Sequence, residues 1–541
     1  MQKTKIFHKN YTLNEKTFQL KLPIELEQII PDNDCVRLLG QFVEEMDLTD
    51  LYSTYSVIRE NQVSPRTMLK ILLYAYHECI YSSRKIETAC RRDINFMYLL
   101  QGHCPPDHTT IARFRTLHFA ECAERLMTET SSILMEMKEI SGREIFIDGT
   151  KIEANANKYT FVWKKAAAKN MTKLMDKSAS LIEECVECYD LRHPWHGEVN
   201  IDIMEKTLRD LNSIIESEGI RVVHGSGHRK SQLQKHMETL ADYIARLKGY
   251  IEKLNACGER GSYSKTDNDA TFMHMKEDHM MNGQLKPGYN LQAGVDSGYI
   301  TWLTLSWHPN DMNTLTDFIE CMHARLPFQY TTVVADAGYE SEENYSYLEK
   351  HHIVSMIKPS NYEISKRRKY QNDISRRENM EYNPDGDYYT CRNEKRLYAC
   401  GMKRHKTGSG YIRKTTIYSC NECHDCPYRS GCIKGHNFKV PEAERYKRLE
   451  VSRKFERQRA EDLERITSEE GCMLRMNRSI QAEGVFAVMK EDMGFRRFLC
   501  RGHKNVLAET VLLVMAHNIG QLHRKIQHNR LQTHLYELKS A

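Results

Sequence analysis

The stretch Glu144-Ile-Phe-Ile-Asp148 is a short apolar run that ends in an acid, and this pattern predicts a β-strand. The same pattern returns in Thr331-Thr-Val-Val-Ala-Asp336. Between these two runs, 289–296 and 299–307 are further apolar runs, and the Ser-Gly dipeptide between them is typical of a β-hairpin. A sheet with two strand-terminal acids is therefore the expected centre of the fold.

Three more predicted helices and one more predicted strand follow the hairpin. Helices are expected at 313–326, from 341 and at 479–492, and a strand at 353–358. Without two insertions, the order is strand, strand, strand, helix, strand, helix, strand, helix. This order matches the ribonuclease-H-like fold, in which the first and fourth strands are neighbours. We therefore expect Asp148 and Asp336 side by side, with Glu483 facing them from the last helix.

The two insertions differ in character. Residues 165–260 are expected to be helical, because apolar residues recur at alternating spacings of four and three from Leu233 to Leu254. Met204 to Ile215 repeats the pattern, so we expect an antiparallel helical hairpin, with an oligomerisation coiled coil as the alternative. Residues 359–465 form a polar, basic insertion that contains cysteines.

Residues 1–135 are expected to form an all-α N-terminal domain, and residues 136–541 a mixed α+β catalytic domain. In the N-terminal part, Cys104-Pro-Pro-Asp-His separates two short predicted helices, and the second contains Arg113 and Arg115. Such a pair is typical of a helix-turn-helix-like DNA-binding module. A plain helical bundle is equally consistent with the pattern.

Three carboxylates at one place need counter-charge, because they repel one another when they are ionised. Two divalent metal ions remove this repulsion and support phosphodiester chemistry, by activating one oxygen and stabilising the leaving one. Oxygen ligands favour Mg²⁺, for which Mn²⁺ can substitute. Asp148, Asp336 and Glu483 are therefore predicted to be both catalytic and metal-binding.

Four motifs resemble those of bacterial insertion-sequence DDE transposases: FIDGTKIEANANKY (146–159), KPGYNLQAGVD (286–296), VVADAGYES (333–341) and RSIQAEGVFAVMKEDMGFRRF (478–498). Residues 15–120, with SSRKIETACRRD and PDHTTIARFR, resemble the InsH-like N-terminal domain of that group. The resemblance implies that Asp148, Asp336 and Glu483 are the metal ligands of a DNA strand-transfer enzyme.

The resemblance also implies DNA contacts. Lys490 matches a lysine that contacts DNA phosphate seven residues after the glutamate, and two helical turns place it on the face of Glu483. The related signature has an arginine four residues before the glutamate, where this chain has Ser479. Arg478 is one position away and is a DNA-contact candidate, as is Lys151.

The second insertion contains four closely spaced cysteines, Cys420, Cys423, Cys426 and Cys432. Such spacing can hold a structural Zn²⁺ through thiolates. Free thiols and an iron–sulfur cluster are the alternatives.

The bulk composition agrees with a DNA-binding protein. The formal charge is only +5 over 541 residues, but basic runs lie beside aromatic residues in 366–370 and 445–459, as a phosphate-binding surface requires. The N-terminus lacks the features of a signal peptide, and no apolar run is long enough to span a membrane. We therefore expect a cytoplasmic, nucleoid-associated protein.

The predicted function is that of a transposase that binds the inverted repeats of an insertion sequence and target DNA, cleaves a strand and transfers it. A homodimer is expected on DNA, because both element ends must join one target. Two alternatives remain open: an inactive, domesticated DNA-binding protein, and a ribonuclease-H-like nuclease that cuts without joining.

Overall fold

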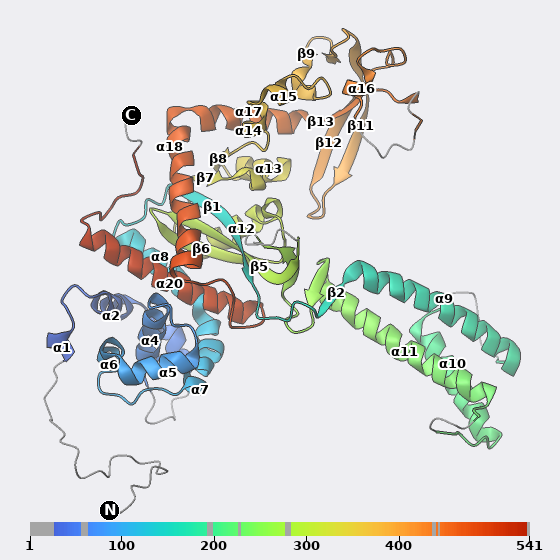
Figure 1. The fold of residues 1–541 in the computed structure, drawn as a ribbon, viewed down its shortest axis with the longest axis horizontal. Coiled ribbons are helices and arrows are strands. Elements are labelled where there is room, and N and C mark those ends of the chain that lie inside the picture. Colours follow the sequence, from blue (N-terminus) through green and yellow to red (C-terminus); the bar gives the residue numbers. More distant parts are fainter. Residues whose placement is uncertain are drawn as a thin grey trace, which may run out of the picture.

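The computed structural model describes residues 26–55, 63–191, 199–224, 229–275, 283–434, 440–441 and 444–537. Residues 1–25 and 56–62 of the predicted N-terminal domain therefore lie outside the described residues. Figure 1 shows a central sheet with a body of N-terminal helices on one side. A helical arm and a smaller β-rich part project from the sheet in two other directions.

The N-terminal body is all helical, as predicted. It contains α1 (Leu26–Ile29), α2 (Cys35–Glu45), α3 (Thr49–Ser53), α4 (Pro65–His77), α5 (Ser83–Arg92), α6 (Ile94–Leu100), α7 (His108–Arg113) and α8 (Ala120–Glu136). α4 is buried along most of its length and forms the centre of the body. The side chain of Asp107 caps α7 by accepting from the backbone N of Thr110 at 2.6 Å. A π-helical segment, Phe114–Phe119, joins α7 to α8.

The central sheet contains six strands. They are β1 (Glu144–Glu153), β4 (Thr271–His274), β5 (Leu285–Asp296), β6 (Tyr299–Ser306), β7 (Thr332–Ala335) and β8 (Val354–Ile357). The order is β6-β5-β1-β7-β8, and β4 pairs with the first part of β5. β1 pairs antiparallel with β5 and parallel with β7, which pairs parallel with β8. The predicted first and fourth strands are thus neighbours.

Two predicted helices of this region also form, α12 (Leu315–Arg325) and α13 (Glu342–Lys350), and Ser341 caps α13. One prediction about the strands is wrong. β1 does not end at Asp148 but continues to Glu153, because β5 keeps pairing with it up to that residue.

The first insertion is a helical arm, but it has three helices rather than the predicted two. They are α9 (Lys164–Tyr189), α10 (Ile201–Ser217) and α11 (Gln232–Cys257), and both α9 and α10 pack against α11. The arm has its own hydrophobic core, which includes Leu233, Leu240 and Leu247 of the predicted seam. Two short strands, β2 (Phe161–Trp163) and β3 (Ser262–Ser264), pair at its base.

The second insertion contains a five-stranded antiparallel sheet that the sequence did not predict. Its order is β13-β12-β11-β10-β9. The strands are β9 (Glu381–Asn383), β10 (Tyr388–Thr390), β11 (Arg396–Lys406), β12 (Ile412–Ser419) and β13 (Arg448–Val451). Three short helices accompany them, α14 (Tyr362–Ser365), α15 (Arg368–Gln371) and α16 (Arg429–Cys432).

The chain returns to the central sheet through α17 (Arg453–Thr467) and α18 (Glu469–Arg478), which Figure 1 shows meeting at a sharp corner. Two π-helical segments, Ser479–Glu483 and Val488–Asp492, flank α19 (Gly484–Ala487). The chain then forms α20 (His503–Gln527), whose central residues are buried.

α20 lies between the N-terminal body and the sheet. It packs against α2, α4 and α8 on one side and against β6 on the other. A helix that is apolar on all sides is expected at such a buried position. One hydrophobic core therefore extends from the N-terminal helices through α20 into the central sheet.

Candidate active site

The register of the sheet places Asp148 beside Asp336. Ile147 of β1 lies opposite Ala335 of β7, and the two acids follow these residues directly. Residues at matching positions of paired strands point to the same face of a sheet. Both carboxylates therefore lie on one face at the end of β7, and Asp148 is only 7% exposed.

Glu483 approaches the same place from the π-helical segment after α18. Arg478 connects it to Asp148: its Nη2 donates to Glu483 Oε1 at 2.5 Å, and its Nη1 lies 4.0 Å from Asp148 Oδ2. Ser479 Oγ donates to Glu483 Oε2 at 3.1 Å. Arg478 thus links Glu483 to Asp148 and offsets part of the repulsion between these two acids.

A buried tyrosine lies next to these acids. Burial, followed by the charges of Asp311, Asp148 and Asp336, raises the pKa of Tyr339 well above its usual range. The neutral phenol donates a 2.5 Å hydrogen bond to Gln292 Oε1 on β5. This bond fixes the loop that follows Asp336 against the sheet.

Asp311 is a fourth acid close to the site, and the sequence analysis missed it. Its Oδ1 accepts hydrogen bonds from Asn290 Nδ2 at 2.8 Å and from Gln292 Nε2 at 3.0 Å. A methyl group at position 149 would collide with the Asp311 and Gln292 side chains, so Gly149 makes room for this network. The available signal was an acid shortly after a strand, since β6 ends at Ser306.

The chemistry of the donor set suits a hard divalent cation, because all three predicted ligands are carboxylates. In the part of the chain that the structure describes, however, no group of three or more ligating side chains is arranged to hold a metal ion. At this site Arg478 instead pairs with Glu483 and approaches Asp148.

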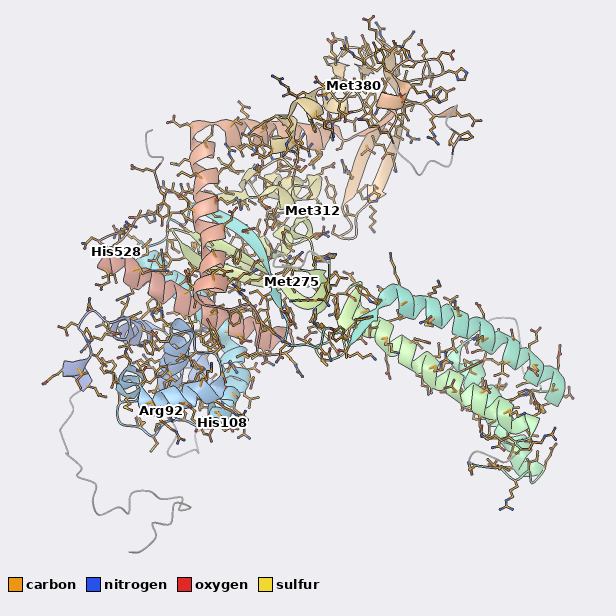
Figure 2. The ribbon with its side chains drawn as sticks, in the orientation of Figure 1. Arg92, His108, Met275, Met312, Met380 and His528 are labelled. Carbon is orange, nitrogen blue, oxygen red and sulfur yellow. The ribbon has the colours of Figure 1, made fainter. Side chains whose placement is uncertain are left out.

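The predicted DNA-binding helices lie at one edge of the N-terminal body, where Figure 2 labels Arg92 on α5 and His108 on α7. Glu87 Oε2 of α5 accepts from the backbone N of His108 at 3.0 Å, and this bond ties the two helices together. Arg113 is exposed at the end of α7, where DNA can reach it.

The prediction for Arg115 is wrong, because its side chain is buried. Its Nη1 donates to Tyr76 Oη at 3.2 Å and to the carbonyl oxygen of Tyr81 at 3.3 Å. Burial raises the pKa of Glu509 on α20, and the positive charge of Arg115 opposes that rise. Arg115 therefore lies in the core between the N-terminal body and α20 and is not part of a DNA-binding surface.

The predicted common face of Lys490 and Glu483 is also absent. Lys490 is 8% exposed, whereas the Glu483 side chain is 53% exposed. The π-helical segments at both ends of α19 change the angle between successive residues, so two α-helical turns no longer describe the spacing. Lys151 lies on β1 three residues after Asp148, hence on the opposite face of the sheet.

The four predicted zinc ligands line one small cavity of about 20 Å³, together with Cys391 from the end of β10. Burial raises the pKa of the Cys420 thiol to about 11, and the neighbouring thiols of Cys423 and Cys391 add to the rise. The backbone N of Lys447 donates to Cys423 Sγ at 3.4 Å. Cys391 lies 29 residues before Cys420 in the sequence, yet it lines the same cavity.

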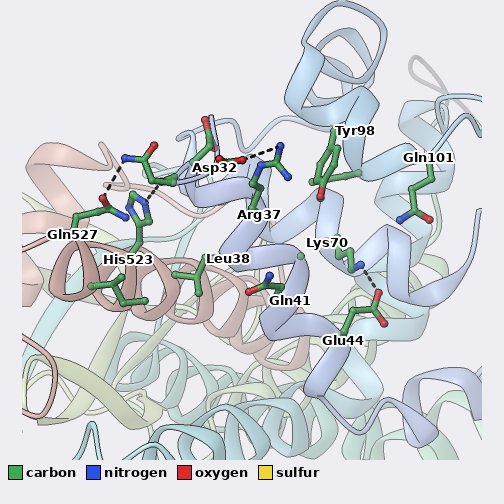
Figure 3. A pocket seen from close by; sticks show the side chains of 15 residues that line it. Asp32, Arg37, Leu38, Gln41, Glu44, Lys70, Tyr98, Gln101, His523 and Gln527 are labelled. Atoms are coloured by element: carbon green, nitrogen blue, oxygen red, sulfur yellow. Dashed lines mark hydrogen bonds and ion pairs between the residues drawn. The ribbon is translucent and has the colours of Figure 1, made fainter. Parts of the chain in front are cut away.

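A larger cavity of about 530 Å³ opens elsewhere, between α2, α4, α6 and the end of α20 (Figure 3). Among its lining residues, Lys70 Nζ donates to Glu44 Oε1 at 2.5 Å, and Arg37 Nη2 donates to the Ile30 carbonyl at 2.9 Å. The three predicted acids do not line this cavity. It is therefore separate from the candidate active site.

Two family models match the chain. A transposase DDE domain matches residues 390–523, and a Transposase domain (DUF772) matches residues 24–117. The first match contains Glu483 but neither Asp148 nor Asp336. No curated protein and no solved structure matches the chain. The resemblance to insertion-sequence DDE transposases is confirmed by these two models.

Across the described ranges, the helices are too short or too polar to pass through a membrane.

Proposed function

We propose that this chain, which carries transposase domains at both ends, binds the ends of an insertion sequence and catalyses metal-dependent strand cleavage and strand transfer. The observation that carries the proposal is that Asp148 lies beside Asp336 at the end of β7, while Arg478 links Glu483 to Asp148. Of these three acids, Glu483 lies within the stretch that the DDE domain model matches.

We assign the catalytic sheet to the ribonuclease-H-like fold. The order β6-β5-β1-β7-β8, with β5 antiparallel and β7 and β8 parallel to β1, supports this assignment. In such an arrangement the central strand and its parallel neighbour present acids on one face. This is the placement of Asp148 and Asp336.

Asp148, Asp336 and Glu483 would hold Mg²⁺, with Mn²⁺ as a substitute, and the metal would supply an activated oxygen and stabilise a leaving one. Other residues of the chain release and position these acids. Arg478 releases Glu483 for this role and is then free to pair with a DNA phosphate. The bond from Tyr339 to Gln292 holds Asp336 in place, because it anchors the loop directly after that acid.

Binding to DNA involves exposed cations at a distance from the acids. Arg113 on α7 is the candidate in the N-terminal body, and α5 and α7 form the helix pair that carries it. Since both element ends must reach one target, a homodimer forms on DNA. Such a protein would work in the nucleoid.

We further propose that a structural Zn²⁺ would stabilise the second insertion, although the described thiols are not arranged as a metal site. The support is that Cys391, Cys420, Cys423, Cys426 and Cys432 share one small cavity in a part whose own hydrophobic core is small. Metal analysis of the purified protein should find zinc near one ion per chain, with loss of the zinc in Cys423→Ser. Zinc-free protein with an unchanged melting temperature would remove this part of the proposal.

A strand-joining assay tests the proposed activity. Purified protein, Mg²⁺, a labelled duplex of the DNA that borders the coding region, and a circular target plasmid should yield labelled plasmid. Cut duplex without labelled plasmid would favour the nuclease alternative. Binding without any cutting, at all Mg²⁺ and Mn²⁺ concentrations, would favour the inactive DNA-binding protein.

A further inference from the structure

The two longest strands of the second insertion form a ribbon that is rich in positive charge. The ribbon consists of β11, β12 and the turn between them, residues 396–419, and this stretch contains no Asp or Glu. Most of β11 is exposed on both faces. Its basic side chains are Arg396, Lys403, Arg404, His405, Lys406, Arg413 and Lys414.

The pairing of the two strands increases the repulsion among these cations. Arg404 lies directly opposite Lys414, and His405 lies directly opposite Arg413. Like charges at directly opposed positions destabilise an antiparallel pair. A ribbon with this arrangement gains stability when it contacts a polyanion.

Only part of the charge is neutralised within the protein. Lys403 pairs with Glu450 at 3.1 Å, and Arg413 pairs with Glu342 at 3.1 Å. Arg404, Lys406 and Lys414 are exposed, and across the described residues no acid forms an ion pair with them. Three cations near the turn between β11 and β12 are therefore available to an external partner.

The turn at the end of the ribbon is hydrogen-bonded to α13. Tyr411 Oη donates to Glu342 Oε1 at 2.9 Å, and Thr407 Oγ1 donates to Glu343 Oε2 at 3.4 Å. Both glutamates lie in the first turn of α13, which starts six residues after Asp336. Figure 1 shows the ribbon extending from the second insertion back towards α13. The ribbon is thus held against α13, the helix that follows Asp336 in the chain.

We propose that this ribbon binds the phosphate backbone of the duplex that carries the scissile phosphate, with Arg404, Lys406 and Lys414 as the contacts. A two-stranded β-ribbon fits the width of the major groove of B-DNA, and contacts to phosphates fix the register of a duplex without reading its sequence. The proposal rests on the proposed function, because it assigns a role in positioning the DNA that the acids cut.

The test uses the triple variant Arg404→Gln, Lys406→Gln, Lys414→Gln. Its binding to the duplex that borders the coding region is measured in EDTA at several salt concentrations, which separates binding from cleavage. Removing three phosphate contacts should lower the salt slope, log Kd against log salt, by about 2.7. The melting temperature should not fall, because the substitutions remove repulsion between the strands.

A matched control is Lys206→Gln, Arg209→Gln, Lys235→Gln in the helical arm, which removes the same charge from α10 and α11. This control should keep the wild-type slope. A second control, Arg404→Lys, should keep the slope as well, because the charge is retained.

Two failures are distinguishable. In the first, wild-type protein binds and cuts the duplex, but the salt slope of the ribbon triple variant falls no further than that of the arm control. This result overturns the ribbon proposal and leaves the proposed function intact. If wild-type protein does not bind this duplex, the proposed function fails as well.

Discussion

At the scale of residues, Arg478 offsets part of the repulsion between Glu483 and Asp148. It donates to Glu483 and lies near Asp148, and one of its nitrogens, Nη1, is buried without a hydrogen-bond partner among the described residues. An arginine in this position acts as an internal counter-ion for carboxylates that a metal would otherwise neutralise. Sequence reasoning selected Arg478 only as a DNA contact, since spacing alone cannot show which acids a side chain reaches.

Arg478→Gln should therefore make stability more dependent on Mg²⁺. Without metal, the variant loses a charge-assisted hydrogen bond and should be less stable by about 1–3 kcal/mol. Mg²⁺ should raise the melting temperature of the variant more than that of wild type, because no guanidinium competes for Glu483. Thermal unfolding with and without Mg²⁺ measures both effects, and Arg475→Gln, three residues earlier on α18, is the control. Equal Mg²⁺-induced shifts in wild type and Arg478→Gln would contradict this role.

His517 on α20 makes stability depend on pH. Burial lowers its pKa to about 4 from 6.5, so the folded protein binds its proton less readily than the unfolded chain does. Stability should thus fall as pH decreases from about 6.5 to about 4, by at most about 3 kcal/mol from this residue.

The measurement for His517 is the urea midpoint across that pH range for wild type and His517→Gln. The variant lacks the titrating group, so its midpoint should vary less with pH than that of wild type. Parallel curves for the two proteins would show that His517 does not control the pH dependence.

At the scale of elements, the corner between α17 and α18 determines where Glu483 lies. Ser468 caps α18 by accepting from the backbone N of Gly471 at 3.1 Å. A Cβ atom at position 471 would collide with the backbone carbonyl of Arg465. The close approach of the two helices therefore requires glycine at this position.

Gly471→Ala should destabilise the protein by about 1–3 kcal/mol, because backbone at the corner must shift to admit the methyl group. Gly249→Ala on α11 is the control: nothing lies within 4 Å of its Cβ position, and alanine favours the helix by up to about 1 kcal/mol. Chemical denaturation of both variants gives the comparison. Equal stability of the two would mean that the corner tolerates a side chain.

The sequence predicted those elements whose apolar pattern is strong. β7 and β8 are short apolar runs, and α11 has a regular seam, so these were found. α9 was not separated from its neighbours, because Ala167, Ser178 and Cys185 are among its few buried residues and give a weak periodic signal. β11 was missed because Leu397 is its only buried residue, and exposed strands show no alternation.

The same distinction applies to the candidate site. Asp148 and Asp336 could be found because each follows an apolar strand run. Asp311 and Tyr339 lie in 3₁₀-helical segments of three residues, which are too short for a periodic pattern to reveal which side chains meet. Lys490 was misplaced because sequence does not show π-helical turns, which change the face a residue occupies.

For the whole molecule, α20 joins the N-terminal body to the catalytic sheet through one core, whereas the helical arm has a core of its own. Units that share a core open together, and units with separate cores open separately. The shared core thereby fixes the N-terminal helices relative to the acids. A DNA end that contacts both the helices and the acids would require this fixed arrangement.

Hydrogen exchange should reflect this division. Amides of α4 and of β1 should exchange with similar free energies of opening, because both depend on the core around α20. Amides of α9 and α11 should exchange through a separate opening of lower free energy. Markedly faster exchange in α4 than in β1 would show that the N-terminal body unfolds independently.

The central claim is that Asp148, Asp336 and Glu483 act together as a metal-dependent site on DNA. Cleavage of a labelled duplex from the DNA bordering the coding region, in Mg²⁺ or EDTA, tests it with wild type, Asp336→Asn and the exposed control Asp317→Asn. Cleavage should need Mg²⁺, fall at least about 100-fold in Asp336→Asn, and persist in Asp317→Asn, while all three proteins bind the duplex. Full cleavage by Asp336→Asn, or cleavage by wild type in EDTA, would contradict the account.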